Sequence, residues 1–235
     1  MIRHYRLVRT VPRPLTISVI VPCAAAHLSN LMGVISNLRA QTRKPDEVVI
    51  AVSGCARSKI SALENTAKHS LGCDVVVVHD PAQAWAGANR NRAAAAAKGD
   101  VLICQDADDL SHPQRVEIIA SLFEHYAIDH LMHFFSYLTV DRSVFSIPDA
   151  VRVSSYCDDF TKFMKAEYRP GPVRHVHNGN CAVMRQLARA VKWPDLRRGQ
   201  DVAFSRLIYA RTKNTVVTSL PLLTYRQNLS TKARP

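Results

Sequence analysis

Residues 17–104 alternate short apolar runs with longer segments of helical periodicity, and this alternation restricts the fold more than any other feature. Strands are predicted where β-branched or apolar runs are bounded by turn-forming residues. They cover residues 17–21, 47–52, 74–78 and 101–104. Helices are predicted between them at 28–38, 58–71 and 85–98. This order favours an α/β fold with a mostly parallel central sheet and helices on both faces.

The pattern becomes less regular after residue 110. Strand-like segments are found at 129–140, 180–184, 215–218 and 222–225, and helical spacing at 113–126, 185–191 and 201–211. Residues 143–172 are polar and weakly patterned, which indicates a mobile or substrate-facing region. No low-complexity linker divides the chain, so a single domain over 1–235 is expected.

The composition is that of a globular protein. Apolar residues make up 47% of the 235 residues, enough for a substantial core. The six cysteines are scattered without a Cys-x-x-Cys pair, which favours reduced thiols over a disulfide framework or a zinc site. The basic N-terminus lacks the apolar segment of a secretory signal, and no apolar run is long enough to span a bilayer. A cytoplasmic location is therefore expected.

Lysine and arginine total 31 against 19 acidic residues, which gives a formal net charge of +12. A surface of this sign favours phosphorylated ligands, anionic lipid headgroups or nucleic acid. The alternative is a charge that only maintains solubility, since the arginines are dispersed. No stripe of aromatic residues interleaves with arginine, so nucleic acid is the less favoured partner. A peripheral position at the inner, anionic face of a membrane is the other option.

Three carboxylates follow the fourth predicted strand within four positions: Asp106, Asp108 and Asp109. Ligands of open α/β sheets bind at the carboxyl ends of the strands. Crowded carboxylates repel one another unless a cation neutralises them, and oxygen ligands suit Mg²⁺ or Mn²⁺. The pattern indicates a divalent metal site able to hold a phosphorylated ligand. The alternative is an acidic turn in which Asp109 or Ser111 caps the helix beginning near Pro113.

Several motifs, in this order and spacing, resemble family 2 glycosyltransferases of the GT-A fold. They are ISVIVP at 17–22, ANRN at 88–91, KGD at 98–100, QDADD at 105–109, GQD at 199–201 and YRQNLS at 225–230. The resemblance extends over nearly the whole chain. It implies one Rossmann-like GT-A domain, with a nucleotide-sugar-binding half at 1–110 and a smaller, mixed acceptor and catalytic-base half at 111–235.

The resemblance implies that a sugar moves, with inversion, from a nucleoside diphosphate sugar to a hydroxyl of a glycan, a lipid-linked or another acceptor. By this resemblance Asp108, helped by Asp106, holds Mn²⁺ or Mg²⁺ against the departing diphosphate. Asp201 is the implied general base. The alternative for Asp201 is that its carboxylate only caps the helix that begins there.

Further contacts follow from the same resemblance. Donor contacts are expected from Pro22, Ser53, Arg90, Asp106, Ala107 and Arg226, and acceptor contacts from Gln200, His177 and Trp193. A solvated helix arginine is the alternative for Arg90. Ordinary surface histidine and core tryptophan positions are the alternatives for His177 and Trp193.

The sequence departs from the family at three places. Residues 52–54 are Val-Ser-Gly where relatives carry acids that read the donor base, and Gln200 replaces an acid. No histidine stands near Asn228, where relatives often have one that joins the metal. These departures support an alternative in which the chain is an inactive nucleotide-sugar-binding module that acts as a partner protein.

Overall fold

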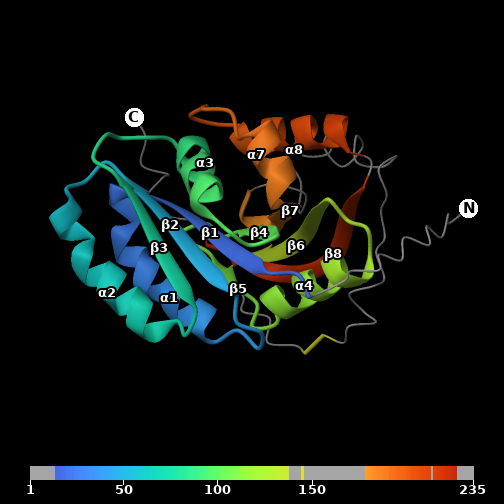
Figure 1. The fold of residues 1–235 in the computed structure, drawn as a ribbon, viewed down its shortest axis with the longest axis horizontal. Helices are drawn as coiled ribbons and strands as arrows, with labels where there is room; N and C mark the ends of the chain where they lie inside the picture. The colour runs from blue at the N-terminus through green and yellow to red at the C-terminus, as the bar shows by residue number, and fades with distance from the viewer. Residues whose placement is uncertain (1–13, 138–143, 146–177, 213, 227–235) are drawn as a thin grey trace, which may run out of the picture.

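The computed structural model describes residues 14–137, 144–145, 178–212 and 214–226. Within them, one eight-stranded sheet has the order β3-β2-β1-β4-β7-β6-β8-β5 (Figure 1). The strands are β1 (Ile17–Ala24), β2 (Glu47–Ser53), β3 (Asp74–Asp80), β4 (Val101–Cys104), β5 (Leu110–Ser111), β6 (His130–Tyr137), β7 (Cys181–Met184) and β8 (Thr215–Tyr225). The helices are α1 (Leu31–Arg39), α2 (Ser61–Ser70), α3 (Ala86–Ala96), α4 (Arg115–His125), α7 (Arg185–Val191) and α8 (Gln200–Arg211).

The four predicted N-terminal strands form the parallel half of the sheet. β1 lies between β2 and β4, so that Val19 pairs with Val48 on one side and Ile103 on the other. Side chains alternate across the sheet: Val19 joins one core cluster, while Ile20 joins the other. Both faces are apolar because helices cover both.

Helices form a layer on each face of the sheet, as the sequence predicts (Figure 1). α1, α2 and α4 cover one face and α3, α7 and α8 the other. Short 3₁₀ turns, η1 (Ala25–Asn30) and η2 (Arg57–Lys59), precede α1 and α2, so these two helices begin later than predicted. A third, η3 (Asn178–Asn180), precedes β7.

The C-terminal half of the sheet is mixed. β7 runs antiparallel to β4 and β6, β6 is parallel to β8, and β8 pairs antiparallel with β5. The two strands predicted at 215–218 and 222–225 are wrong as separate elements, because β8 continues through Pro221. A register shift opposite His133 and Phe134 accommodates the proline, which cannot donate to the ladder. Residues 146–172 of the weakly patterned segment lie outside the described residues.

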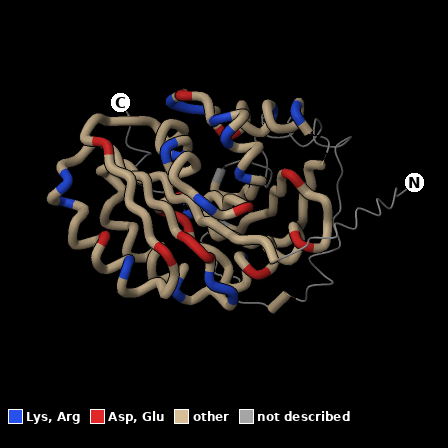
Figure 2. Tube along the Cα trace, viewed as in Figure 1, with Lys and Arg blue, Asp and Glu red and all other residues tan. Residues whose placement is uncertain are grey.

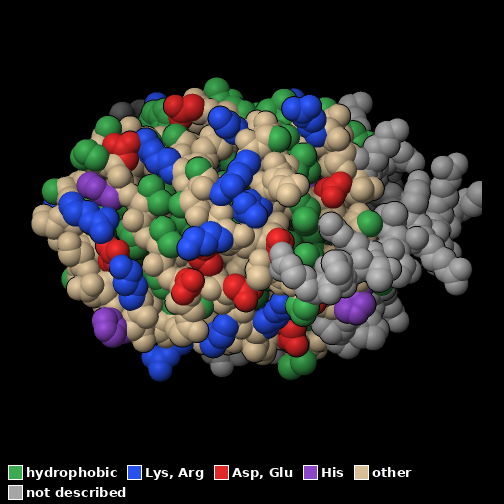
Figure 3. Space-filling model, viewed as in Figure 1, with side chains coloured by type: hydrophobic (Ala, Val, Ile, Leu, Met, Phe, Trp, Pro, Cys, Tyr) green, Lys and Arg blue, Asp and Glu red, His purple; other side chains and the backbone are tan. Residues whose placement is uncertain are grey.

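Lys and Arg residues are found on both helical layers, and the layer that contains α7 and α8 has few acidic residues to balance them (Figure 2). Between residues 185 and 211 the sequence has seven Lys or Arg residues against two Asp residues. Figure 3 shows basic side chains gathered over the face formed by α3 and α7. In the described part of the chain, no helix combines the length and apolar character needed to cross a bilayer.

Candidate functional site

A cleft of about 270 Å³ opens at the carboxyl ends of β1 and β4. Its lining comes from four separate segments of the chain. These are Pro22, Cys23, Ala24 and His27 after β1, Ala84, Ala86, Asn89 and Arg90 around the start of α3, Asp106, Ala107 and Asp108 after β4, and Gln200 and Asp201 at the start of α8. This is the edge at which parallel α/β sheets bind their ligands.

The acidic turn after β4 is held by its own first side chain. Gln105 is fully buried, and its Nε2 donates to the carbonyl oxygens of Asp106 and Asp109, each at 3.0 Å. Its Oε1 accepts a hydrogen bond from Ser111 Oγ at 2.5 Å. Because one buried amide binds both ends of the turn, Asp106 and Asp108 are presented to the cleft in a fixed arrangement.

Asp109 and Ser111 do not cap α4, so that interpretation of the turn is wrong. Asp109 is fully buried, and its Oδ1 accepts the backbone N–H of Arg226 at 3.0 Å. At the start of α4, Gln41 Oε1 accepts the N–H of Val116 at 3.1 Å. The N–H of Gln114, which precedes α4, is bound by His112 Nδ1 at 3.2 Å. Asp109 therefore connects the turn to the end of β8, and the start of α4 is bound by His112 and Gln41.

A buried arginine of α4 donates hydrogen bonds to the residues at the start of the acidic turn. Arg115 donates to Gln105 Oε1 at 2.8 Å, to the carbonyl oxygen of Cys104 at 2.7 Å and to that of Gly179 at 2.6 Å. It also donates to His133 Nε2 at 3.0 Å. Burial lowers the pKa of Arg115 to about 10, so it stays charged at neutral pH. One cation thus joins the end of β4 to α4, β6 and η3.

Arg90 is buried at the side of the cleft, so the interpretation as a solvated helix arginine is wrong. Only 4% of its side chain is exposed, and Nη2 forms an ion pair with Asp106 Oδ1. Burial lowers the pKa of Arg90, but attraction to Asp106, Cys104 and Asp201 and the hydrogen bond to Asp106 together outweigh burial and raise the pKa. Within the described residues, its Nε and Nη1 have no hydrogen-bond partner. Two buried donors without acceptors are costly, and an anionic ligand would satisfy them.

Asp108 faces a different partner. Its Oδ2 lies 3.7 Å from His27 Nδ1, and the two side chains are 29% and 39% exposed. Burial and the nearby Asp106 raise the pKa of Asp108, which means that its charge is poorly compensated. A cation at this point would relieve that repulsion, so the carboxylate fits a divalent ion. In the part of the chain that is described, no group of three His, Cys, Asp or Glu residues is arranged to hold a metal.

The carboxylate of Asp201 lines the cleft from the opposite element, α8. Gly199, with φ of 73°, turns the chain into this helix in a conformation that favours glycine. Asp201 Oδ1 accepts the N–H of the next residue, Val202, at 3.0 Å, while the N-cap position of α8 is Gly199 and has no side-chain capping hydrogen bond. It lies close enough to Arg90 to raise that residue's pKa.

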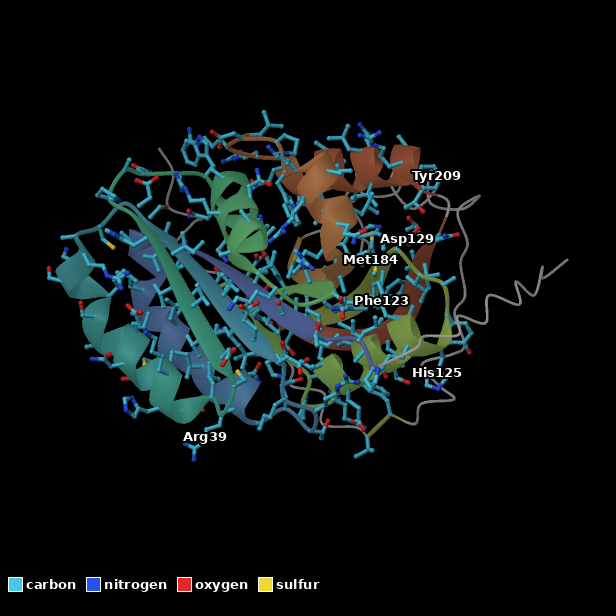
Figure 4. The ribbon with its side chains drawn as sticks, viewed as in Figure 1. Arg39, Phe123, His125, Asp129, Met184 and Tyr209 are labelled. Carbon is cyan, nitrogen blue, oxygen red and sulfur yellow. The ribbon has the colours of Figure 1, made fainter. Side chains whose placement is uncertain are left out.

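The far end of α8 is anchored to the sheet. Asp129, labelled in Figure 4, precedes β6, and its Oδ2 accepts hydrogen bonds from Thr212 Oγ1 at 2.6 Å and Asn214 Nδ2 at 3.1 Å. Both donors lie just after the helix. The position of Asp201 at the cleft therefore depends on contacts at both ends of α8.

α3 and the segment before α8 approach one another closely. A Cβ added to Gly87 would lie 2.4 Å from the carbonyl oxygen of Pro194 and 2.6 Å from Gln200 Oε1. Asn91 exchanges hydrogen bonds of 2.8 Å with both backbone groups of Trp193. Glycine at position 87 thus allows the two walls of the cleft to meet.

The remaining predicted residues occupy varied positions. Ser53 is buried at the end of β2, where its Oγ accepts a hydrogen bond from Asn89 Nδ2 at 2.8 Å, outside the cleft lining. Trp193 is in the core rather than in the cleft, because it stacks on Phe204 with ring centroids 3.9 Å apart. Arg226 Nε donates to the carbonyl oxygen of Asp108. His177 lies outside the described residues.

The sequence of residues 18–191 matches the pattern of the family described as Glycosyl transferase family 2. The chain belongs to this family. A comparison with curated proteins finds no match for the family 2 chain.

Solved structures share its α/β fold at low identity. TarS from S. aureus, residues 1–349 in complex with UDP-GlcNAc, has a TM-score of 0.70 and 16% identity, over 91% of this chain and 59% of that chain. Mannosyltransferase PcManGT from Pyrobaculum calidifontis, in complex with GDP-Man and Mn²⁺, has a TM-score of 0.62 and 19% identity, over 94% of this chain and 60% of that chain. Glucosyl-3-phosphoglycerate synthase from Mycobacterium tuberculosis, in complex with Mn²⁺, UDP and phosphoglyceric acid, has a TM-score of 0.61 and 17% identity, over 93% of this chain and 73% of that chain. The family 2 chain spans about three fifths of the TarS and PcManGT chains.

Sequence reasoning missed three residues of this family 2 site: His27, Gly87 and Arg115. Arg115 lies in a helix in which only the spacing of the apolar residues is visible in the sequence, and that spacing does not indicate a buried arginine. His27 lies outside the family motifs. Gly87 directly precedes the ANRN motif, and its place near the start of a predicted helix was the one available signal.

Proposed function

We propose that the protein is a metal-dependent inverting glycosyltransferase that uses a nucleoside diphosphate sugar. One observation carries the proposal: a single cleft is lined by Asp106 and Asp108, by Arg90 with two unpartnered donors, and by Asp201 from another helix. This arrangement supplies groups for a diphosphate on one side and a carboxylate for proton transfer on the other. The family and the ligands of the solved neighbours support the same reaction class.

The donor is proposed to lie with its diphosphate next to Arg90, whose Nε and Nη1 can donate to phosphate oxygens. Pro22 and Ala107 line the same cleft and shape the space for the nucleoside. Asp106 forms an ion pair with Arg90, while Arg226 Nε donates a hydrogen bond to the backbone of the acidic turn. A divalent ion, Mn²⁺ or Mg²⁺, when bound at Asp108 neutralises the charge that develops on the leaving diphosphate.

The acceptor is proposed to enter beside α8. Asp201 then accepts the proton of the acceptor hydroxyl as the oxygen attacks the sugar carbon from the face opposite the diphosphate. Attack from that face inverts the configuration at the carbon. Gln200, adjacent in the cleft, is placed to hydrogen-bond a hydroxyl of the acceptor without adding a charge.

The experiment that tests the proposal compares wild type with Asp201→Asn. Both are assayed with Mn²⁺ for hydrolysis or transfer from a set of nucleoside diphosphate sugars, and for binding of UDP and GDP by thermal shift. The variant is expected to lose about 10²- to 10⁴-fold in turnover. It should keep its melting temperature and its nucleotide affinity, because the asparagine Oδ1 can still accept the Val202 N–H. Equal turnover of the two proteins would overturn the role of Asp201.

The second candidate function is a nucleotide-sugar-binding module without catalysis. It is favoured by the neutral residue at Gln200 and by Ser53, whose hydroxyl is already bonded to Asn89. Stabilisation by a nucleoside diphosphate, about 2.7 kcal/mol at a hundred times its Kd, combined with no turnover of any donor, would favour this module over the enzyme.

A further inference from the structure

Among the residues that the structure describes, His27 is the one histidine in the lining of the cleft, and no family motif includes it. It stands on η1, the 3₁₀ turn that follows β1, with its side chain 39% exposed. Its Nδ1 lies 3.7 Å from Asp108 Oδ2. That separation is too long for a hydrogen bond.

The same separation suits two ligands of one ion. Ligand atoms about 2.1 Å from a divalent ion lie about 3.0 Å apart at right angles and about 4.2 Å apart on opposite sides. The distance of 3.7 Å between His27 Nδ1 and Asp108 Oδ2 lies inside this range. Rotation of the two side chains, without movement of the backbone, would bring both atoms to the closer of these two spacings around one ion.

The second carboxylate of the acidic turn, Asp106, is paired with a different side chain. Asp106 Oδ1 is paired with Arg90, a side chain that is almost fully buried and cannot turn away. The Nε and Nη1 of that arginine, without partners in the described residues, point to an anionic ligand in the same cleft. Such a ligand would bring phosphate oxygens that complete the coordination of an ion held by few protein atoms.

We propose that His27, through Nδ1, is a ligand of the divalent ion together with Asp108, and that this pair selects Mn²⁺ over Mg²⁺. The inference rests on the proposed function, because a nucleoside diphosphate supplies the remaining ligands. Mg²⁺ prefers oxygen ligands and near-ideal octahedral geometry, while a first-row transition ion accepts imidazole nitrogen more readily. His27 thus supplies the imidazole that the sequence lacks near Asn228.

The test is pulsed electron paramagnetic resonance of Mn²⁺ bound to the protein with UDP. A directly coordinated imidazole gives a nitrogen-14 coupling that a histidine outside the coordination sphere does not give. Wild type is compared with two variants, His27→Ala and His69→Ala. His69 is the control because it is exposed on α2 and does not line the cleft. The coupling should be present in wild type and His69→Ala and lost in His27→Ala.

Affinity and selectivity give a second readout. The Kd for Mn²⁺ in the presence of UDP, measured by calorimetry, should rise about tenfold or more in His27→Ala. His27→Asp should retain ion binding and reduce the preference for Mn²⁺ over Mg²⁺, because it restores an oxygen ligand. Since His27 is half-exposed, the melting temperatures of both variants should match that of wild type.

The outcomes separate this inference from the proposed function. Binding of Mn²⁺ with UDP, but without a nitrogen coupling that depends on His27, would overturn the inference and leave the glycosyltransferase proposal intact. Failure of wild type to bind either Mn²⁺ or a nucleoside diphosphate would overturn both.

Discussion

Arg90 shows at the scale of one residue how a ligand is implied by the free protein. Its guanidinium is buried beside Asp106, yet two of its N–H groups lack partners in the described residues. A buried donor left without an acceptor costs about 1–3 kcal/mol. The neighbouring Asp108 carries a negative charge that burial and Asp106 make unfavourable, as its raised pKa shows. The proposed binding of a diphosphate together with a cation would lower both costs.

Replacing Arg90 by lysine should weaken nucleotide binding more than it disturbs the fold. Lysine retains the positive charge beside Asp106 but cannot present the planar set of donors to phosphate oxygens. We expect the Kd for UDP with Mn²⁺ to rise about tenfold to a hundredfold, equivalent to about 1.5–3 kcal/mol for hydrogen bonds to a charged group. Isothermal titration calorimetry measures this directly.

Arg57→Lys is the matched control, since Arg57 lies on η2, pairs with Glu64 and is not part of the cleft lining. It should bind UDP as wild type does. An equal loss of affinity in both variants would indicate a general electrostatic effect and contradict a specific contact by Arg90.

At the scale of elements, the site depends on how closely α3 meets the segment that leads into α8. Gly87 makes this contact possible, because a side chain there would collide with the Pro194 carbonyl, a backbone atom that cannot rotate away. The segment carries Gln200 and Asp201 into the cleft. A shift of α8 would therefore displace Gln200 and Asp201 from the cleft as well as Phe204 and Ile208 in the core.

Gly87→Ala should lower both stability and activity. Alanine favours the helix by up to about 1 kcal/mol, but overpacking costs about 1–3 kcal/mol. We expect a net loss in the free energy of unfolding, measured with urea, and a larger proportional loss in turnover. Gly33→Ala in α1 is the control, because nothing lies within 4 Å of its added Cβ. The control should be neutral or stabilised, and a stabilised Gly87→Ala with full activity would contradict this account.

The β6 strand begins with a histidine that makes stability depend on pH. His130 is fully buried, and burial lowers its pKa from 6.5 to about 3. The unfolded chain binds a proton at this residue below about pH 6.5, while the folded protein does not. The stability that neutral His130 contributes is therefore complete above pH 6.5 and is lost as the pH falls from 6.5 towards 3.

This linkage should reach about 1.4 kcal/mol of unfolding free energy per pH unit below 6.5. Denaturant titrations at pH 7.0, 5.5 and 4.5 measure it in wild type and in His130→Gln, which keeps a polar group near Thr215 but does not titrate. The variant should show a shallower decline. Parallel declines in the two proteins would contradict the assignment to His130.

At the scale of the whole molecule, the net charge of +12 is unevenly distributed. Between residues 185 and 211, which include α7 and α8, seven Lys or Arg residues stand against two Asp residues, and basic side chains lie over the face formed by α3 and α7 (Figure 3). An acceptor or a surface of negative charge would be attracted to this side. We propose an anionic membrane surface or a lipid-linked acceptor as the partner, with nucleic acid less favoured.

Binding to anionic vesicles should therefore depend steeply on salt. The Debye length falls from about 10 Å at 0.1 M salt to about 3 Å at 1 M, so an attraction between exposed charges is screened. Co-sedimentation with phosphatidylserine vesicles should decrease strongly over this range, and neutral phosphatidylcholine vesicles should bind little at any salt concentration. The double variant Arg197→Glu, Arg198→Glu, with both positions exposed, should bind less at low salt. Binding that is independent of salt would contradict an electrostatic partner.

The sequence by itself determined the alternation of strands and helices over residues 17–104, the acidic turn and the family. These depend on local features: periodicity of apolar side chains, turn residues at the ends, and short motifs in a fixed order. It did not predict that β8 is one strand, because Pro221 is a local break that only pairing with β6 accommodates.

Tertiary structure alone decided the partners of the charged groups. Arg90 is buried against Asp106, His27 faces Asp108 across 81 positions of sequence, and Asp109 binds the backbone of Arg226 from the far end of the chain. A sequence pattern records which residues are charged, but the free energy of a charge depends on its burial and its neighbours. Those are fixed only when the sheet brings the ends of β1, β4 and β8 together.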